Sequence, residues 1–442
     1  MNANEIAAET ESISRRRMLS RLGLTFAGGA LLGTMAPSAR AAGGEPARSA
    51  RAFSVRDFGA VGDGITDDTA AFTAAMKAAV DTKTLAVFAP AGRYLINDRL
   101  EVPPQVLLEG VFVAPAARSP VEGSVLLAVA GAGNADGLPF ISLSTGSTLR
   151  GLTIFYPDQK MKNPPVPYPW TIRGHGDNIC LIDLLLVNPY QAVDFGTFPA
   201  GRHFISGLYG QPLYRGLFID QCFDVGRVEN VHFWSFWGGW GGDIYDFMAA
   251  EGVAFTLGRT DWQFLSNCFC IGYRTGYHFI QNKFGPGNCL LTQCGSDVGP
   301  RAVLVDAGQM HAGHSFVNCQ FMAGIEIAKS NTGPVKFTAC GFWGIPSTNH
   351  HALLEGTGQT IFNSCHFISW GQKDKNAPAI LARAGGLTVT ACDFMDAGKP
   401  QITLEQDLEA ALIYGNRLRG KERIADHTNG RAQIALNQVS GK

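Results

Sequence analysis

The sequence has almost no net charge, no C-x-x-C cysteine pair and, beyond its first residues, no long hydrophobic run. The formal net charge is −1 for 442 residues, so no basic excess favours nucleic acid or an anionic membrane surface as a partner. No run after residue 41 is apolar and long enough to cross a membrane. None of the ten cysteines forms a C-x-x-C pair, which argues against a zinc site.

The first 41 residues predict a twin-arginine export signal. Residues 14–19 read SRRRML, an apolar stretch runs from Leu22 to Met35, and Ala39-Arg40-Ala41 has the small-x-small pattern of a cleavage site. The alternative is a chance arginine cluster before a membrane anchor, but the apolar stretch is short. The mature chain is therefore expected to be a single domain, residues 42–442, that is periplasmic or secreted.

A ladder of cysteines in the second half predicts the fold. Cys294, Cys319, Cys340, Cys365 and Cys392 follow one another at intervals of 25, 21, 25 and 27 residues, each with an apolar residue three positions earlier and three of them with another five positions earlier. A fixed period of this size is typical of repeat architectures, and alternating apolar positions indicate strands. Short strands joined by corners at this period predict the coils of a parallel β-helix.

The same frame recurs outside the cysteines. It is found around Val111, Leu152, Leu184, Val231, Cys268 and Asn416, which gives eleven rungs and predicts about 11 coils. The gaps between the first five of these rungs are 41, 32, 47 and 37 residues. Their excess length predicts loops that leave the coil, and long loops on a rigid scaffold are where binding residues concentrate.

The cysteines themselves are expected to be free thiols. The ladder places them inward at the spacing of adjacent strands, about 4.8 Å, where a thiol behaves as a small hydrophobe. The twin-arginine route exports proteins that have folded in the reducing cytoplasm, which also argues against disulfides.

One segment resembles a known family. Residues 53–79 read FSVRDFGAVGDGITDDTAAFTAAMKAA and are similar to the opening of the pectate-lyase-like superfamily of right-handed parallel β-helix proteins, which includes polygalacturonase-type hydrolases, exo-glucanases and phage tailspikes. The resemblance implies an all-β, right-handed, single-stranded parallel β-helix with an N-terminal capping helix. In this setting Asp57, Asp63, Asp67 and Asp68 are expected to be structural, as turn and cap residues.

The resemblance does not extend to a reaction. Polygalacturonase-type hydrolases carry N-T-D, D-D, G-H-G and R-I-K segments on successive coils. Here only Gly174-His175-Gly176 is present, so their mechanism is not transferred.

The strand before each corner predicts an outward-facing polar stripe. If the apolar residues of these strands point inward, the opposite face presents Arg173, Asp220, His278, Asp306, Glu326 and Glu355. Taken singly, each carboxylate could equally be a solvated surface residue.

A tryptophan-rich segment, residues 234–262, is the main candidate for the chemistry. It combines aromatic and acidic side chains, which a sugar subsite and a glycosidic acid–base pair both require. The candidate catalytic residues are Asp220, Asp243, Asp246, Glu251 and Asp261, and the candidate stacking residues are Trp237, Trp240, Trp262 and Tyr245. The alternative is a tryptophan-rich plug packed on the coil wall.

Other long excursions are expected to form the walls of a groove. Residues 156–170 carry several prolines and end at Trp170, and residues 195–216 end near Arg215. We expect Trp170, Arg173, Arg215, His278 and Asp306 to contact substrate.

Together these features predict an exported carbohydrate-active enzyme that cleaves a polysaccharide, with glycoside hydrolysis favoured. One alternative is a polysaccharide lyase or uronate epimerase, with Arg173, Arg215 or His278 assisting. Another is a non-catalytic glycan-binding or envelope β-helix. No cofactor is required, although a lyase would admit a divalent cation such as calcium. The expected partner is a polysaccharide or oligosaccharide rather than nucleic acid, and the resemblance also admits a homotrimer.

Overall fold

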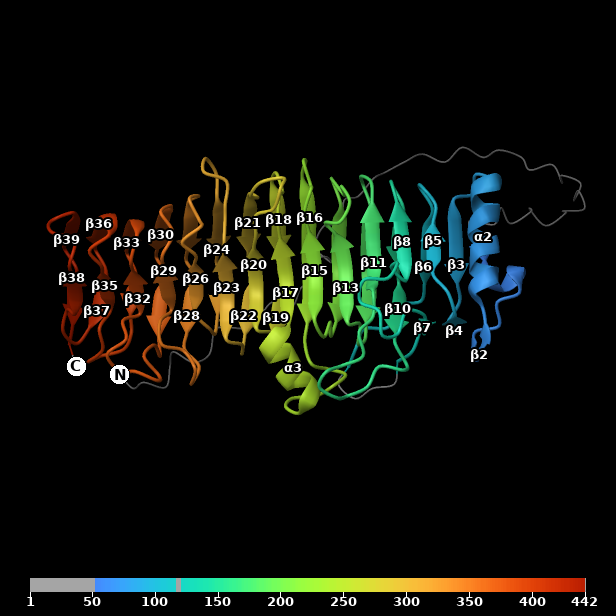
Figure 1. Ribbon diagram of the computed structural model, residues 1–442, viewed down its shortest axis with the longest axis horizontal. Coiled ribbons are helices and arrows are strands. Elements are labelled where there is room, and N and C mark those ends of the chain that lie inside the picture. The colour runs from blue at the N-terminus through green and yellow to red at the C-terminus, as the bar shows by residue number, and fades with distance from the viewer. Residues whose placement is uncertain (1–51, 117–120, 442) are drawn as a thin grey trace, which may run out of the picture. The chain divides into compact units, whose positions relative to one another are not determined.

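The computed structural model describes residues 52–116 and 121–441, so the predicted export signal lies outside the described residues. The described chain winds into a parallel β-solenoid of about 15 turns, stacked side by side from helix α2 (Thr69–Asp81) at one end to β38 and β39 at the other (Figure 1). No helix in this part of the chain is long and apolar enough to cross a membrane. The predicted all-β parallel β-helix is confirmed.

One side of the solenoid is a 13-stranded parallel sheet, here called sheet B. Its strands are β5 (Leu100–Val102), β8 (Ile141–Ser144), β11 (Trp170–His175), β13 (Gln191–Phe195), β15 (Arg215–Ile219), β17 (Val253–Leu257), β20 (Thr275–Phe279), β23 (Arg301–Val305), β26 (Ile325–Ile327), β29 (Ala352–Leu354), β32 (Ile380–Ala382), β35 (Ile402–Leu404) and β38 (Ile424–Asp426).

The remaining strands form a 27-stranded sheet, sheet A, made of two ladders that merge in β12, β14 and β16. The first ladder holds β1 (Phe53–Ser54), β3 (Ala86–Ala89), β6 (Leu107–Gly110), β9 (Thr148–Arg150), β12 (Cys180–Leu186), β14 (Phe204–Gly210), β16 (Gly226–Phe233), β18 (Gln263–Ser266), β21 (Cys289–Thr292), β24 (His314–Val317), β27 (Val335–Thr338), β30 (Gln359–Asn363), β33 (Gly385–Thr390), β36 (Leu408–Tyr414) and β39 (Ala432–Ala435). The second holds β2 (Asp63–Asp67), β4 (Gly92–Ile96), β7 (Ser124–Ala128), β10 (Leu152–Phe155), β19 (Phe269–Ile271), β22 (Gly295–Asp297), β25 (Gln320–Phe321), β28 (Gly341–Trp343), β31 (His366–Ile368), β34 (Asp393–Phe394), β37 (Arg417–Arg419) and β40 (Gln438–Ser440).

The corner between the two ladders explains the cysteine frame. The residue before each ladder cysteine has a positive φ, for example 54° at Gln293 and 52° at Asn318. A single left-handed residue turns the chain and shifts the apolar phase, so the next side chain, the cysteine, points inward. All ten cysteines are free, and those of the ladder are buried, as expected.

The interior is filled by repeating side chains. The Phe337 ring stacks on that of Phe316, with centroids 4.7 Å apart, and on that of Phe362 at 5.1 Å. In these three neighbouring turns each ring is therefore buried against the ring of the next turn. At the first end, α2 covers the opening of the solenoid with Phe72, Ala75 and Met76, which are all buried. A short 3-10 helix, η1 (Val55–Phe58), precedes it.

Two expectations about the coils are corrected. Eleven coils is an undercount, because the gap of 47 residues between Leu184 and Val231 contains a whole turn. Leu208 on β14 pairs with Leu184 on one side and with Val231 on the other. Residues 195–216 are therefore not simply a groove loop.

At the first end of the solenoid, Asp68 accepts hydrogen bonds from the N–H groups of Val61 and Gly62, which confirms its structural role.

Candidate functional site

Part of the tryptophan-rich segment is a plug, and part lies at a groove. Trp234, Phe236 and Trp237 pack outside sheet A against Leu185 and Val187. The chain then passes through a glycine-rich turn into helix α3 (Asp243–Glu251), which lies below the strands in Figure 1 and leads into β17. The plug predicted as the alternative thus describes residues 234–237, and the predicted groove wall describes the part that leads into α3.

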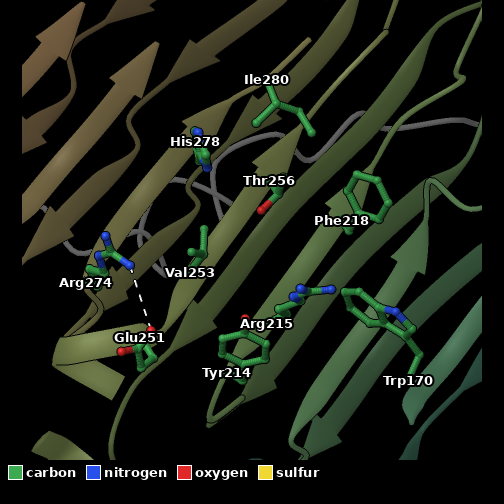
Figure 2. A pocket seen from close by; sticks show the side chains of 10 residues that line it. All are labelled: Trp170, Tyr214, Arg215, Phe218, Glu251, Val253, Thr256, Arg274, His278 and Ile280. Atoms are coloured by element: carbon green, nitrogen blue, oxygen red, sulfur yellow. Dashed lines mark ion pairs between the residues drawn. The ribbon is translucent and has the colours of Figure 1, made fainter. Parts of the chain in front are cut away.

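A cavity of about 360 Å³ lies on the outer face of sheet B beside α3 (Figure 2). Of the residues expected at the site, Trp170, Arg215, Glu251 and His278 line it together. The other lining residues are Tyr214, Phe218, Val253, Thr256, Arg274 and Ile280. The cavity therefore combines an aromatic and aliphatic floor with two arginines, a histidine and one carboxylate.

Arg215 is the cation at the centre of the groove. Its guanidinium carbon lies 4.8 Å from the centroid of the Tyr214 ring, and Figure 2 shows the side chain between Trp170 and Tyr214. Its Nη1 donates to Oε1 of the buried Gln191 at 3.5 Å. No described carboxylate lies within ion-pair distance of Arg215, whereas other arginines on this sheet have such partners. It is therefore available to an anionic ligand.

Gln191 is held in turn by two loops, the one between β7 and β8 and the one that precedes β11. Its amide Nε2 donates to the carbonyl oxygens of Ala135 and Tyr168, at 2.8 and 3.2 Å. The Tyr214 ring is packed against the rings of Tyr190 and Phe247, with centroids 5.1 and 6.2 Å away. The cation is thus pre-positioned by buried neighbours rather than free to sample many rotamers.

His278 and Asp306 form a pair on neighbouring strands. Nε2 of His278 lies 2.7 Å from Oδ2 of Asp306, and the two side chains are 25% and 39% exposed. Thr256 is the strand neighbour of His278 in the register, and Phe218 is the next one along. A histidine oriented by a carboxylate and open to a cavity has the geometry of a general base.

Glu251 at the end of α3 faces Arg274 across the groove wall. Their charged atoms are 3.9 Å apart and both side chains are 53% exposed, and the dashed line in Figure 2 marks this pair. An exposed pair at this distance is weak, so Arg274 remains available to a second anionic group.

The other expected carboxylates do not converge on the cavity. Asp220 is 1% exposed and accepts hydrogen bonds from the N–H of Arg259 at 2.6 Å and of Gln221 at 2.9 Å. Asp261 pairs with Arg259 at 2.9 Å and accepts from Gln309 at 2.7 Å. Burial raises the pKa of Asp220, and the two backbone hydrogen bonds oppose that rise.

Asp243 and Asp246 lie in the exposed first turn of α3. None of Asp220, Asp243, Asp246 and Asp261 lines the cavity.

The remaining stacking candidates lie around the groove rather than in it. Trp240 is 60% exposed and its ring centroid is 6.1 Å from that of Tyr245. The Tyr245 ring packs on Gly272, where an added Cβ would lie 2.8 Å from the ring. Trp262 is 57% exposed at the opposite corner of the turn.

The other members of the outward stripe are already paired. Arg173 donates to the fully buried Asp194 at 2.5 Å. Glu326 pairs with Arg301 at 3.2 Å, and Glu355 pairs with Arg383 at 2.6 Å.

A calcium ion was admitted above for a lyase, and the partners of the groove carboxylates decide whether one would fit. Among residues 52–116 and 121–441 no three side chains of the histidine, cysteine, aspartate and glutamate types come together as a metal site. Calcium requires several oxygen ligands, whereas the groove carboxylates Glu251 and Asp306 each face a cation or a histidine. The groove does not fit a calcium ion, and arginines supply its positive charge.

Sequence reasoning missed Arg274, Phe218 and Thr256. One signal could have found the first of them, because arginine recurs at or directly before the start of three strands of sheet B, at Arg215, Arg274 and Arg301. Phe218 and Thr256 occupy the row of His278, which only the strand register reveals.

Comparison with known proteins agrees with this architecture. Residues 52–117 match the family model described as rhamnogalacturonase A/epimerase, pectate lyase-like. No curated protein matches the sequence.

Several solved structures share the fold. The A-module of the Azotobacter vinelandii mannuronan C-5 epimerase AlgE6 matches with a TM-score of 0.58 and 15% identity, covering 88% of this chain and 99% of that one. The N-terminal fragment of bacteriophage phi29 gene product 12 matches with a TM-score of 0.60 and 12% identity, covering 88% and 70%. The tailspike of Escherichia coli bacteriophage HK620, solved with a hexasaccharide, matches with a TM-score of 0.50 and 10% identity, covering 88% and 78%.

At these identities the structural matches show the fold alone. The family match covers the first turns and confirms the resemblance of the N-terminal segment. The described chain is thus a single-stranded parallel β-helix, and its residues 52–117 match a pectate lyase-like family model.

Proposed function

We propose that the groove on sheet B binds an acidic polysaccharide and removes the proton on C5 of a uronate unit. In this proposal Arg215 and Arg274 bind the uronate carboxylate, and His278, oriented by Asp306, accepts the proton. The observation that carries the proposal is the His278–Asp306 pair, 2.7 Å apart, at the edge of a cavity lined by two arginines.

The chemistry needs this combination of residues. A proton next to a carboxylate is hard to remove, because the carbanion places further negative charge on a group that is already anionic. Guanidinium groups that contact the carboxylate oxygens stabilise that charge as it develops. A neutral histidine held at one nitrogen presents the other nitrogen as base.

Two outcomes follow proton removal. In elimination, the electron pair of the C5–H bond forms a C4–C5 double bond, and the oxygen on C4 leaves with its bonding electrons and is protonated. In epimerisation, C5 is protonated again on the opposite face. Both belong to the lyase or epimerase alternative, and the geometry now favours that class over hydrolysis.

Hydrolysis requires two carboxyl groups about 5–9.5 Å apart. One carboxylate, Glu251 before β17, lines the cavity, and another, Asp306 after β23, is bonded to the lining residue His278. Val253 lies in the same register row as Arg301, and Asp306 lies five residues further on, about 16 Å along the strand direction. These two groups are too far apart to act as an acid–base pair.

We also propose that the chain is exported and acts outside the cytoplasm. The twin-arginine pattern of residues 14–19 and the apolar stretch after it support this. They lie outside the described residues.

The test is an assay on a panel of acidic and neutral polysaccharides. The wild type should yield unsaturated sugars, seen by ultraviolet absorbance, or uronates with inverted C5, seen by proton NMR. His278→Gln should lower the rate about 10²–10⁴-fold, as expected for loss of a general base. Glu251→Gln, which alters a groove carboxylate without removing the base, is the control and should retain most of the rate.

Reducing ends without unsaturated or inverted sugars would favour hydrolysis instead. Binding without turnover, unchanged in His278→Gln, would favour the non-catalytic glycan-binding alternative.

A further inference from the structure

At the ends of the sheet B strands that lie away from α3, a surface follows the cavity-lining residue Ile280 that no part of the proposed function uses. It is made of the corners that follow β15, β17 and β20, where the chain leaves sheet B. The tightest of these is the turn Asn282–Gly285, in which the N–H of Gly285 donates to the carbonyl of Asn282 at 3.0 Å. The N–H of Phe284 donates to Oδ1 of Asn282 at 2.8 Å. Lys283 and Phe284 therefore occupy the tip of a closed turn.

Asp220 ties these corners together. It follows β15, and its Oδ1 accepts the backbone N–H of Arg259, which follows β17. Its Oδ2 accepts the side-chain amide of Asn282, which follows β20. One buried carboxylate thus binds three successive turns. Gly258 makes room for it, because an added Cβ there would lie 2.6 Å from Oδ1 of Asp220.

The tip of the turn presents a cation beside aromatic rings. The ammonium of Lys283 is 4.9 Å from the centroid of the Phe284 ring, and that ring lies 6.3 Å from the ring of Phe223. Lys283 is exposed, and no described carboxylate lies within ion-pair distance of it. Arg259, the neighbouring cation over Phe223, is by contrast paired with Asp261.

The turn and Arg215 lie on opposite sides of His278. In the register, Arg215 shares a row with Thr275 of β20, three residues before His278. Lys283 comes five residues after His278 on the same segment. A ligand that places one unit at Arg215 and His278 therefore extends towards Lys283 if it is more than one unit long.

We infer that Lys283 and Phe284 form a second subsite, which binds the carboxylate and the apolar ring face of a further uronate unit. Asp220 and Asn282 are its positioning residues. Charge and an adjacent aromatic face are the two features that recognise an acidic sugar. The inference rests on the proposed function, since it assigns a further unit of the same substrate.

The experiment measures binding of uronate oligosaccharides of increasing length to the full chain, by calorimetry. Lys283→Gln should weaken binding of the longer oligosaccharides about tenfold, the expected cost of one charge-assisted contact, and leave the shortest ligand that binds unchanged. Lys329→Gln, at an exposed lysine in the corner after β26, is the matched control and should bind like the wild type.

Asn282→Ala tests the positioning role. It should raise KM for long substrates as Lys283→Gln does, with kcat nearly unchanged and with the shortest ligand still bound normally. A Lys283→Gln protein that equals Lys329→Gln at every length would overturn the subsite, even if His278→Gln abolishes turnover. If the wild type binds no uronate of any length, the proposed function fails, and the second subsite fails with it.

Discussion

Two stretches of the same solenoid differ in how they use their turns. From β10 to the corner after β20 the chain leaves the coil in long excursions, and it presents Arg215 and Lys283 without a carboxylate partner among the described residues. Between β21 and β37 the turns are regular, and outward charges pair between neighbouring turns, as in Arg301–Glu326 and Arg417–Asp393. The regular turns form the solenoid, and the excursions from it form the groove.

The largest change in stability is expected from removing a stacked ring in the regular stretch, between β21 and β37. Phe337→Ala should lower the free energy of unfolding by about 3–5 kcal/mol, because the ring is fully buried between two others. Chemical denaturation measures it. Glycan affinity of the folded fraction should not change, and a specific loss of affinity would show that the two stretches are coupled.

Acid should destabilise both stretches through buried histidines. Burial lowers the pKa of His203, in the irregular stretch, and of His314 and His351, in the regular one, from 6.5 to about 4. In each ring one nitrogen bonds a carbonyl oxygen and the other has no partner.

The unfolded chain therefore binds more protons than the folded chain between pH 6.5 and about 4. Stability should fall as pH is lowered through this range, by roughly 2 kcal/mol per histidine at pH 5. Denaturation at pH 7 and pH 5 measures the loss. His314→Gln should reduce the loss of unfolding free energy between pH 7 and pH 5. A variant that loses as much as the wild type would contradict the assignment of this loss to the buried histidines.

The smallest effect on stability should come from the groove arginine. Arg215→Gln should change the unfolding free energy by about 0.5 kcal/mol or less, as for an exposed side chain, while weakening uronate binding at least about tenfold. Arg417→Gln, an exposed arginine of the regular stretch, is the comparison and should leave binding intact. Equal losses of uronate binding in both variants would contradict the claim that only the irregular stretch binds the ligand.

The fold could be predicted because its signal repeats along the chain. The cysteine after each left-handed residue marks a corner, as at Gln293–Cys294 and Asn318–Cys319. The turn around Leu208 has a glycine corner at Gly207, as the turn around Leu152 has at Gly151, but its repeat was not recognised in the sequence. The outward direction of Arg173, His278 and Glu326 could also be predicted, since they share a register row through their strand neighbours.

The candidate site could be predicted only in part. Asp220 was expected to be catalytic because its spacing places it at the end of an outward strand. Its partner Asn282 lies 62 residues away, and no sequence pattern reveals that the carboxylate is buried. The pairing of His278 with Asp306, 28 residues apart, depends in the same way on the register. Spacing predicts which face a side chain occupies, whereas its partners depend on how the turns stack.

The most direct test of the central claim is exchange of the C5 proton in deuterated water. With the wild type, a bound polyuronate should acquire deuterium at C5 or lose its C5 proton by elimination. With His278→Gln it should do neither. Glycosidic cleavage with the C5 proton fully retained would contradict the account.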